Sequence, residues 1–89
     1  MRIVWDEIKR QANLRKHGFD FAALDMGFFE RALIFPAKQG RRQAIGLFVE
    51  QMAVVIFFRL GEEGLSIISM RAANRKERAL YHDAKNDQA

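Results

Sequence analysis

Hydrophobic and polar residues follow two patterns along the chain, helical at first and strand-like later. The segment RIVWD (residues 2–6) has the apolar and aromatic content of a short strand, and Asp6 is placed to cap a following helix. Trp5, Ile8 and Ala12 mark the inner face of that helix. Gly18 is expected to end it, because glycine adopts a positive φ without steric cost. The pattern therefore predicts a strand and then a helix that ends at a glycine joint.

The residues after this joint predict a second helix. Asp20 is placed to cap it, with Phe19 and Leu24 at the positions of a hydrophobic staple. Phe21, Leu24 and Phe28 share one side at helical spacing, so we expect them to be buried. On the first helix, spacings of three and four residues gather a polar face. It consists of Lys9, Asn13, Lys16 and His17.

Beyond Gly27 the apolar runs become short, β-branched and aromatic, as is typical of strands. Four strands are predicted, at residues 31–35, 43–49, 52–58 and 65–70, with Pro36 ending the first of them. A turn at Glu50 and Gln51 pairs the middle two strands as a hairpin. The unbroken apolar run of residues 52–58 indicates a central strand covered on both faces. Gly46 in its neighbour predicts a bulge or a close approach of backbone.

The last segment predicts a helix over residues 74–84. Asn74 and Glu77 have the spacing of a capping box, and we expect the chain to fray after Lys85. The full order is β-α-α-β-β-β-β-α, which separates the helices from a mostly antiparallel sheet. No repeat, linker or low-complexity segment divides the chain. The predicted fold class is therefore α+β, in a single domain over residues 1–89.

Composition limits the kinds of protein that such a domain can be. At 89 residues and 49% hydrophobic, the chain has room for one core. It has no apolar run of the ~18 to 20 residues that cross a membrane, no secretory leader pattern and no cysteine, so we expect a cytoplasmic protein without disulfides. A net charge of +4 favours polyanionic partners. The positive residues form three groups in the sequence, namely Lys9, Arg10, Arg15 and Lys16, then Lys38, Arg41 and Arg42, then Arg71, Arg75, Lys76 and Arg78.

The chemistry that the side chains allow is narrow. His17 and His82 are the only histidines, and neither belongs to a metal-binding motif, so we expect no metal and no cofactor. No glycine-rich phosphate loop follows a strand, and Ser66 and Ser69 lack a nucleophile-elbow turn. Cleavage of RNA by its own 2′-OH needs only a base, an acid and cations for the crowded phosphate. That reaction fits the Arg, Lys, His, Tyr and Glu residues that remain.

Each candidate residue also has an ordinary structural interpretation. His17 can transfer a proton, or simply interact with the carbonyl groups at the end of its helix. Glu77 can act as a base or as a helix cap, and Tyr81 can contact substrate or pack its ring. Three arginines can bind phosphate through their planar guanidinium groups or remain as solvated charges. They are Arg42, Arg59 and Arg71. The cations of the last helix, for which solvation is the ordinary expectation, are Arg75, Lys76 and Arg78.

Four segments spread over the chain carry a family resemblance, namely WDEIKRQANLRKHGFDFAAL, RRQAIG, VVIFFRLGE and IISMRAANRKERALY. Together they resemble the BrnT-type toxins of bacterial type II toxin-antitoxin systems, which are similar in fold to the RelE and ParE toxins. The resemblance implies a metal-independent ribonuclease that arrests growth and is neutralised by an antitoxin with a ribbon-helix-helix DNA-binding domain. It also implies a heterotetramer or larger complex with that antitoxin, an RNA substrate, and contact with operator DNA only through the antitoxin.

The resemblance also points to site residues, namely Lys16, His17, Arg42, Arg59, Arg71, Glu77 and Tyr81, and the basic groups in the sequence add Arg41, Arg75 and Arg78. We expect the catalytic residues to be His17, Arg59, Arg71, Glu77 and Tyr81. We expect RNA phosphates to be bound by Lys16, Arg41, Arg42, Arg75 and Arg78. The family pattern usually has Glu where this chain has Arg41, and Arg where it has Ser66. Because strand residues alternate between faces, we expect Ser66 to point away from Arg71, so that the missing arginine need not damage a site at Arg71. The alternatives are an attenuated toxin, or a non-catalytic basic module that docks nucleic acid or an acidic protein segment.

Overall fold

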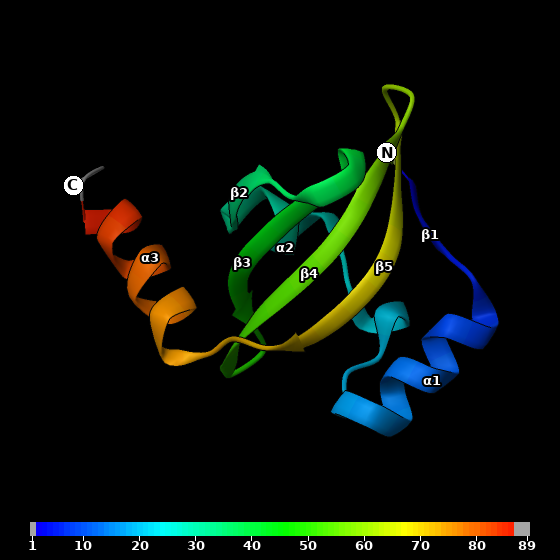
Figure 1. Cartoon of the computed structure of the whole chain (residues 1–89), viewed down its shortest axis with the longest axis horizontal. Coiled ribbons are helices and arrows are strands. Elements are labelled where there is room, and N and C mark those ends of the chain that lie inside the picture. Colours follow the sequence, from blue (N-terminus) through cyan, green and yellow to red (C-terminus); the bar gives the residue numbers. More distant parts are fainter. Residues whose placement is uncertain (1, 87–89) are drawn as a thin grey trace.

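The computed structural model describes residues 2–86, which form a five-stranded sheet with helices around it (Figure 1). The strands are β1 (Arg2–Trp5), β2 (Leu33–Pro36), β3 (Arg42–Phe48), β4 (Gln51–Leu60) and β5 (Gly64–Ala72). The helices are α1 (Glu7–His17), α2 (Met26–Arg31) and α3 (Arg75–Asn86), with short 3-10 turns η1 (Phe21–Ala23) and η2 (Lys38–Gly40). The sheet order is β1-β5-β4-β3-β2, in which β1 is parallel to β5 and the other pairs are antiparallel. The predicted α+β class is confirmed. Of the tail expected to fray, Asn86 is helical and residues 87–89 lie outside the described residues.

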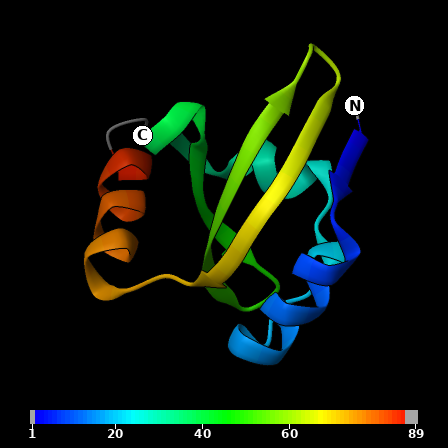
Figure 2. The same ribbon diagram turned by 45° about the vertical axis from the view of Figure 1, so that its right-hand side comes forward.

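The two faces of the sheet are covered unequally. We call the side of Val55 and Phe57 the packed face, because the helical segments from η1 to α2 cover it and it holds the main core. The open face, on the side of Ile56 and Phe58, carries a smaller cluster against which α3 packs. Figure 2 shows α3 and α1 on either side of the β4–β5 pair. As predicted, β4 is central, and Val54 and Val55 are completely buried on opposite faces.

Helix α1 turns its polar side to the sheet, so the inner face predicted at Ile8 and Ala12 is wrong. Both residues are exposed, and Asn13 is the buried residue of the helix. Trp5, the third residue of the predicted face, does pack against the main core. The Asn13 Nδ2 donates to the carbonyl groups of Met70 (2.9 Å) and Phe19 (3.1 Å), and its Oδ1 accepts from the Met70 N–H (3.0 Å). The carboxamide thus pairs with β5 as a strand would, just beyond the end of β1. Because buried backbone groups need partners, this polar contact prevails over the burial of apolar helix residues.

The predicted second helix is divided into two shorter ones. Asp20 caps the first turn through a backbone hydrogen bond of 2.9 Å, as expected. That turn is η1, which ends where Leu24 adopts an extended conformation. Asp25 then caps α2 by accepting from the Phe28 N–H at 3.0 Å. A second capping aspartate therefore starts a new helix, yet the predicted apolar stripe of Phe21, Leu24 and Phe28 is buried.

A bulge in β5 overturns the prediction about Ser66. The pairing between β4 and β5 skips Ile68, which is an extra residue in β5. On either side of it, Ser66 pairs with Phe58 and Arg71 pairs with Val54, and both partners belong to the open face. Ser66 therefore points to the same face as Arg71. Simple alternation fails here because the bulge shifts the register by one residue.

Gly46 marks a close approach, one of the two features predicted from it. A Cβ at this position would lie 3.0 Å from Cε2 of Phe28 and 3.2 Å from Cβ of Ala32. The register between β3 and β4 continues unbroken past Gly46, so the bulge is not here. The close packing of α2 against β3 thus depends on glycine at position 46, which has no side chain.

The hairpin between β3 and β4 turns at Val49 and Glu50, one residue earlier than predicted, because Gln51 already pairs with Phe48. Val49 has a φ of 56°, in the left-handed region, and is 80% exposed. This conformation costs an L-residue with a Cβ about 1–2 kcal/mol.

Replacing Val49 by asparagine should therefore stabilise the protein, because asparagine tolerates the left-handed region. We expect a gain of about 1 kcal/mol, which raises the melting temperature by about 4–8 °C in a domain of this size. Thermal denaturation measures the effect. Glu50→Asn is the control, since Glu50 in the same turn does not have a positive φ. An equal gain in both variants would contradict the assignment of strain to Val49.

Candidate functional site

Several positive residues lie at three places in the structure. The first is on the open face, where Arg71 meets α3. The second is a hollow between α1 and β5, beside His17. The third is a hollow on the packed face, beside Arg42 and Arg59. The first two places are neighbours, because both include the C-terminal half of β5.

On the open face, Arg71 and Glu77 form a two-armed ion pair between β5 and α3. Arg71 Nη1 and Nη2 donate to Glu77 Oε1 and Oε2 at 2.7 and 2.8 Å, and Nη1 also donates to the carbonyl group of Ala72. Glu77 and Asn74 exchange the two backbone hydrogen bonds of the predicted capping box, at 2.9 and 2.8 Å. Gln43 of β3 donates to the same carboxylate at 3.4 Å. The ion pair thus ties the first turn of α3 to the sheet.

This pairing sets the charges of the cluster. The hydrogen bond from Arg71 lowers the pKa of Glu77, against the opposing effect of burial, and the same bond raises the pKa of Arg71. A carboxylate with a lowered pKa is a weak base at neutral pH, so the geometry favours a positioning role for Glu77. A guanidinium group has five N–H donors, of which Arg71 uses three here. The other two have no partner within residues 2–86, and 40% of the Arg71 side chain is exposed.

The Glu77 carboxylate should make the stability of the protein depend on pH. Its pKa is lower in the folded state, so its stabilising effect is present above the usual value near 4.5 and is lost as the pH falls through the folded value. At pH 7 we expect Glu77→Gln to cost about 1–2 kcal/mol. The loss should begin to shrink below about pH 4.5, where the carboxylate of the unfolded chain takes up a proton, and it should be smallest below the lower pKa of the folded state, where both states are protonated.

Thermal denaturation of both proteins between pH 3 and 7 measures this dependence. Glu62→Gln, in the exposed turn before β5, is the matched control and should change little. A Glu77→Gln difference that stayed constant over this range would show that the ion pair does not stabilise the fold.

The rest of α3 packs one aromatic side chain, Tyr81, against the sheet, and its positively charged side chains lie around this contact or in solvent. Tyr81 packs against the smaller cluster of the open face, and Lys85 Nζ lies 5.4 Å from the centroid of its ring. Arg78 Nη1 donates to the carbonyl group of Ala73 at 2.9 Å. Arg75 is exposed in the first turn. The helix therefore brings Tyr81 to the same face as Arg71 and Glu77.

One row of side chains across the open face contains Arg41, Phe58 and Ser66. Arg41 Cζ lies 5.5 Å from the ring centroid of Phe58, and Phe58 pairs with Ser66 on β5. The Arg41 Nε is buried and has no hydrogen-bond partner within the described part of the chain. Arg41, just before β3, and Ser66 of β5 therefore flank the same aromatic ring, and the positive charge of this row lies next to β3.

His17 lies at the end of α1, beside the open face. It lines a hollow of about 280 Å³ with Lys9 and Lys16 of its own helix and with Ser69 of β5. Ser69 pairs with Ile56 and so shares the face of Arg71, two residues further on. The polar face predicted for the first helix is thus turned to β5, where it adds an imidazole and two ammonium groups.

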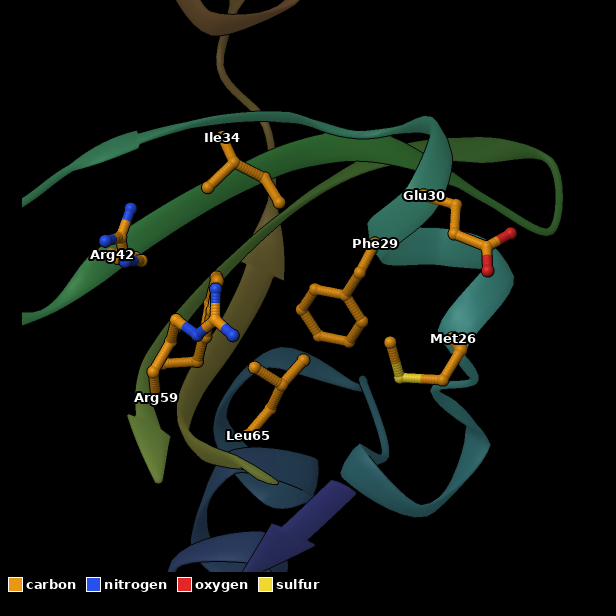
Figure 3. Close-up of a pocket in the computed structure, with 8 residues that line it drawn as sticks. Met26, Phe29, Glu30, Ile34, Arg42, Arg59 and Leu65 are labelled. Atoms are coloured by element: carbon orange, nitrogen blue, oxygen red, sulfur yellow. The ribbon is translucent and has the colours of Figure 1, made fainter. Parts of the chain in front are cut away.

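Arg42 and Arg59 lie together on the packed face, away from Arg71. Figure 3 shows both beside a hollow of about 210 Å³, which Phe57 and Leu65 also line. The two arginines come from adjacent strands, and within residues 2–86 neither forms an ion pair. The expected catalytic set is therefore divided. Arg71, Glu77 and Tyr81 share the open face, His17 stands beside it, and Arg59 is on the other side of the sheet.

Sequence reasoning missed the neutral polar residues of the open face. Gln43 contacts Glu77, and Ser69 lines the hollow next to His17. Both are partly buried residues in strands that are mostly apolar. A polar residue in such a strand is a signal for a functional position. The face to which Ser69 points could not be predicted from sequence, because it depends on the bulge at Ile68.

The described part of the chain has neither a metal-binding group of side chains nor a membrane-spanning helix. In the range 2–86, no three side chains of His, Cys, Asp or Glu are grouped so that they could hold a metal ion. No helix in this range is both long and apolar enough to cross a membrane.

Comparison with known proteins shows what the chain is similar to. Residues 5–77 match the family described as ribonuclease toxin, BrnT, of type II toxin-antitoxin system. The chain is also similar to the crystal structure of the Brucella abortus ribonuclease toxin, BrnT, with a TM-score of 0.81 and 51% sequence identity. That similarity covers 84% of this chain and 99% of the other. Comparison with curated proteins gave no match.

Proposed function

Because the chain belongs to the BrnT family of ribonuclease toxins of type II toxin-antitoxin systems, we propose that it cleaves RNA on the open face of its sheet without a metal ion. The observation that carries this proposal is the position of Arg71, a half-exposed cation held by Glu77 between β5 and α3. RNA lies across the C-terminal half of β5, between the first turn of α3 and the end of α1.

Arg71 supplies positive charge to the phosphate at the cleaved bond. Its guanidinium group is already oriented by Glu77, so little reorganisation is needed when negative charge develops in the transition state. Glu77 positions Arg71, and Tyr81 contacts the substrate from the α3 side. The RNA chain is held by further cations around this face. They are Lys16, Arg41, Arg75 and Arg78, whereas Arg42 and Arg59 are left out because they lie on the packed face.

His17 is the proposed proton-transfer group. Attack of the 2′-OH on phosphorus needs a base to take the hydroxyl proton, and the leaving 5′-oxygen needs an acid. Histidine side chains commonly exchange their proton between about pH 5 and 8, which suits both tasks. The place of His17 next to Ser69, at the margin of the open face, supports this role.

The family implies an antitoxin partner and an RNA target. Beyond this we propose that the antitoxin carries a ribbon-helix-helix DNA-binding domain and forms a heterotetramer or larger complex with the toxin. Operator DNA is then contacted only through the antitoxin. We assign the complex to the cytoplasm, where its RNA target is found.

The proposal is tested by RNA cleavage in excess chelator, together with growth after induction. We expect cleavage to persist and growth to stop unless the antitoxin is co-expressed. Ser69→Glu adds a negative charge to the open face and should weaken RNA binding by about tenfold at moderate salt. Ala23→Glu adds the same charge to an exposed residue of η1 and should have little effect. Folded protein that neither cleaves RNA nor slows growth would favour a non-catalytic basic module or an attenuated toxin.

A further inference from the structure

The hollow on the packed face differs chemically from the open face. It measures about 210 Å³, and its walls come from α2 and from the four strands β2 to β5. Figure 3 shows Phe29 and Leu65 in the middle, with Arg42 and Arg59 on one side and Met26 and Glu30 on the other. Nothing in the proposed RNA site uses these residues. The hollow is therefore available for a second binding event.

The walls suit an aliphatic side chain better than a nucleobase. Phe29 is 6% exposed and Phe57 is 2% exposed, and their rings pack edge to face with centroids 5.2 Å apart. Neither ring has a free face on which a base could stack, as single-stranded RNA requires. The apolar surface that remains accessible belongs to Ile34, which is 39% exposed, and to the partly buried Met26.

The charges around the hollow favour a peptide over an RNA chain. Arg42 and Arg59 are exposed, and neither has a carboxylate partner within residues 2–86. Planar guanidinium groups bind carboxylates well and are frequent at protein interfaces. Glu30, on the opposite side, would repel a polyanion that crossed the hollow. A peptide can place a carboxylate at the arginines and keep uncharged residues near Glu30.

We propose that this hollow is the anchor site for the antitoxin, through an apolar side chain next to one or more carboxylates. The family implies an antitoxin partner, and the inference rests on the proposed function only in placing RNA on the other face. The antitoxin binds to the packed face of the toxin, near the edge strand β2.

The test places a carboxylate in the hollow itself. In Ile34→Glu, the new side chain can pair with Arg42 and Arg59 and occupy the apolar space. We expect the affinity for the cognate antitoxin, measured by calorimetry, to fall by about 30-fold, as for the loss of an interface hot spot. RNA cleavage should stay within about twofold of wild type, since the open face is unchanged. The matched control is Leu60→Glu, at an exposed leucine of β4 outside the hollow, and it should bind the antitoxin normally.

Other outcomes would overturn the inference. Unchanged antitoxin affinity in folded Ile34→Glu protein would remove the hollow from the interface. Loss of RNA binding with normal antitoxin affinity would identify it as an RNA subsite. If Ile34→Glu does not fold, Arg59→Gln provides the second variant and should lower antitoxin affinity by about tenfold. Antitoxin affinity is measured without cleavage, so failure of the proposed ribonuclease mechanism would not be confused with failure of this inference.

Discussion

Replacing His17 by glutamine will slow single-turnover RNA cleavage by about 100-fold or more, with little change in melting temperature. Glutamine keeps hydrogen-bonding capacity but cannot exchange a proton near neutral pH. His17 is exposed at the end of α1 and is not part of the core, so the fold should tolerate the change. The rate of the wild-type protein should depend on pH, and the variant should lose the part of this dependence that proton transfer by His17 causes.

Excess chelator during the measurement keeps contaminating metal from replacing the imidazole. His82→Gln is the matched control, because His82 is the other histidine and lies on α3. It should keep the wild-type dependence on pH. Should His17→Gln cleave at the normal rate with an unchanged pH profile, His17 merely ends its helix. Proton transfer would then have to involve Tyr81 or another residue of the open face.

Replacing Asn13 by leucine will lower the free energy of unfolding by about 3 kcal/mol or more, the largest stability effect that we expect. The change leaves the N–H and C=O groups of Met70 and the C=O group of Phe19 without their present partner. Each buried polar group without a partner costs about 1–3 kcal/mol. In a domain of this size, the melting temperature should fall by about 12–24 °C.

Thermal denaturation and exchange of the Met70 amide hydrogen measure this effect. Gln11→Leu, at an exposed position of the same helix, introduces the same side chain without breaking these bonds and should change stability little. Wild-type protection of the Met70 amide in Asn13→Leu would show that another group takes over the pairing.

The parts of the fold that sequence predicted well are those decided by neighbouring residues. Asp6 caps α1, Gly18 ends it with a φ of 76°, and the capping box of Asn74 and Glu77 starts α3. Each depends on a contact within a few positions. The inner face of α1 was wrong for the opposite reason. Asn13 is buried by a contact with Met70, 57 positions away, which no local pattern encodes.

The candidate site shows the same division. Residue types alone indicated which side chains could handle a phosphate, but their grouping depends on which face each strand residue takes. One bulged residue, Ile68, brings Ser66 and Arg71 to the same face. The two-armed bond between Arg71 and Glu77 also had no sequence signal beyond the capping spacing. The sequence therefore identifies the positively charged residues, but it does not show which of them lie together in the fold.

The carboxamide of Asn13 also protects the protein from unwanted association. Beyond the end of β1, β5 would otherwise present unpaired backbone groups, and such strand edges recruit strands of other molecules into aggregates. The Asn13 side chain forms hydrogen bonds with these backbone groups of β5. Because Asn13 belongs to a helix, a strand from another molecule cannot pair at this place. The outer strands of the described sheet, β1 and β2, are only four residues long, and β2 ends in a proline that cannot donate to a neighbour. A toxin that must stay available for its antitoxin is thereby guarded against self-assembly into fibrils.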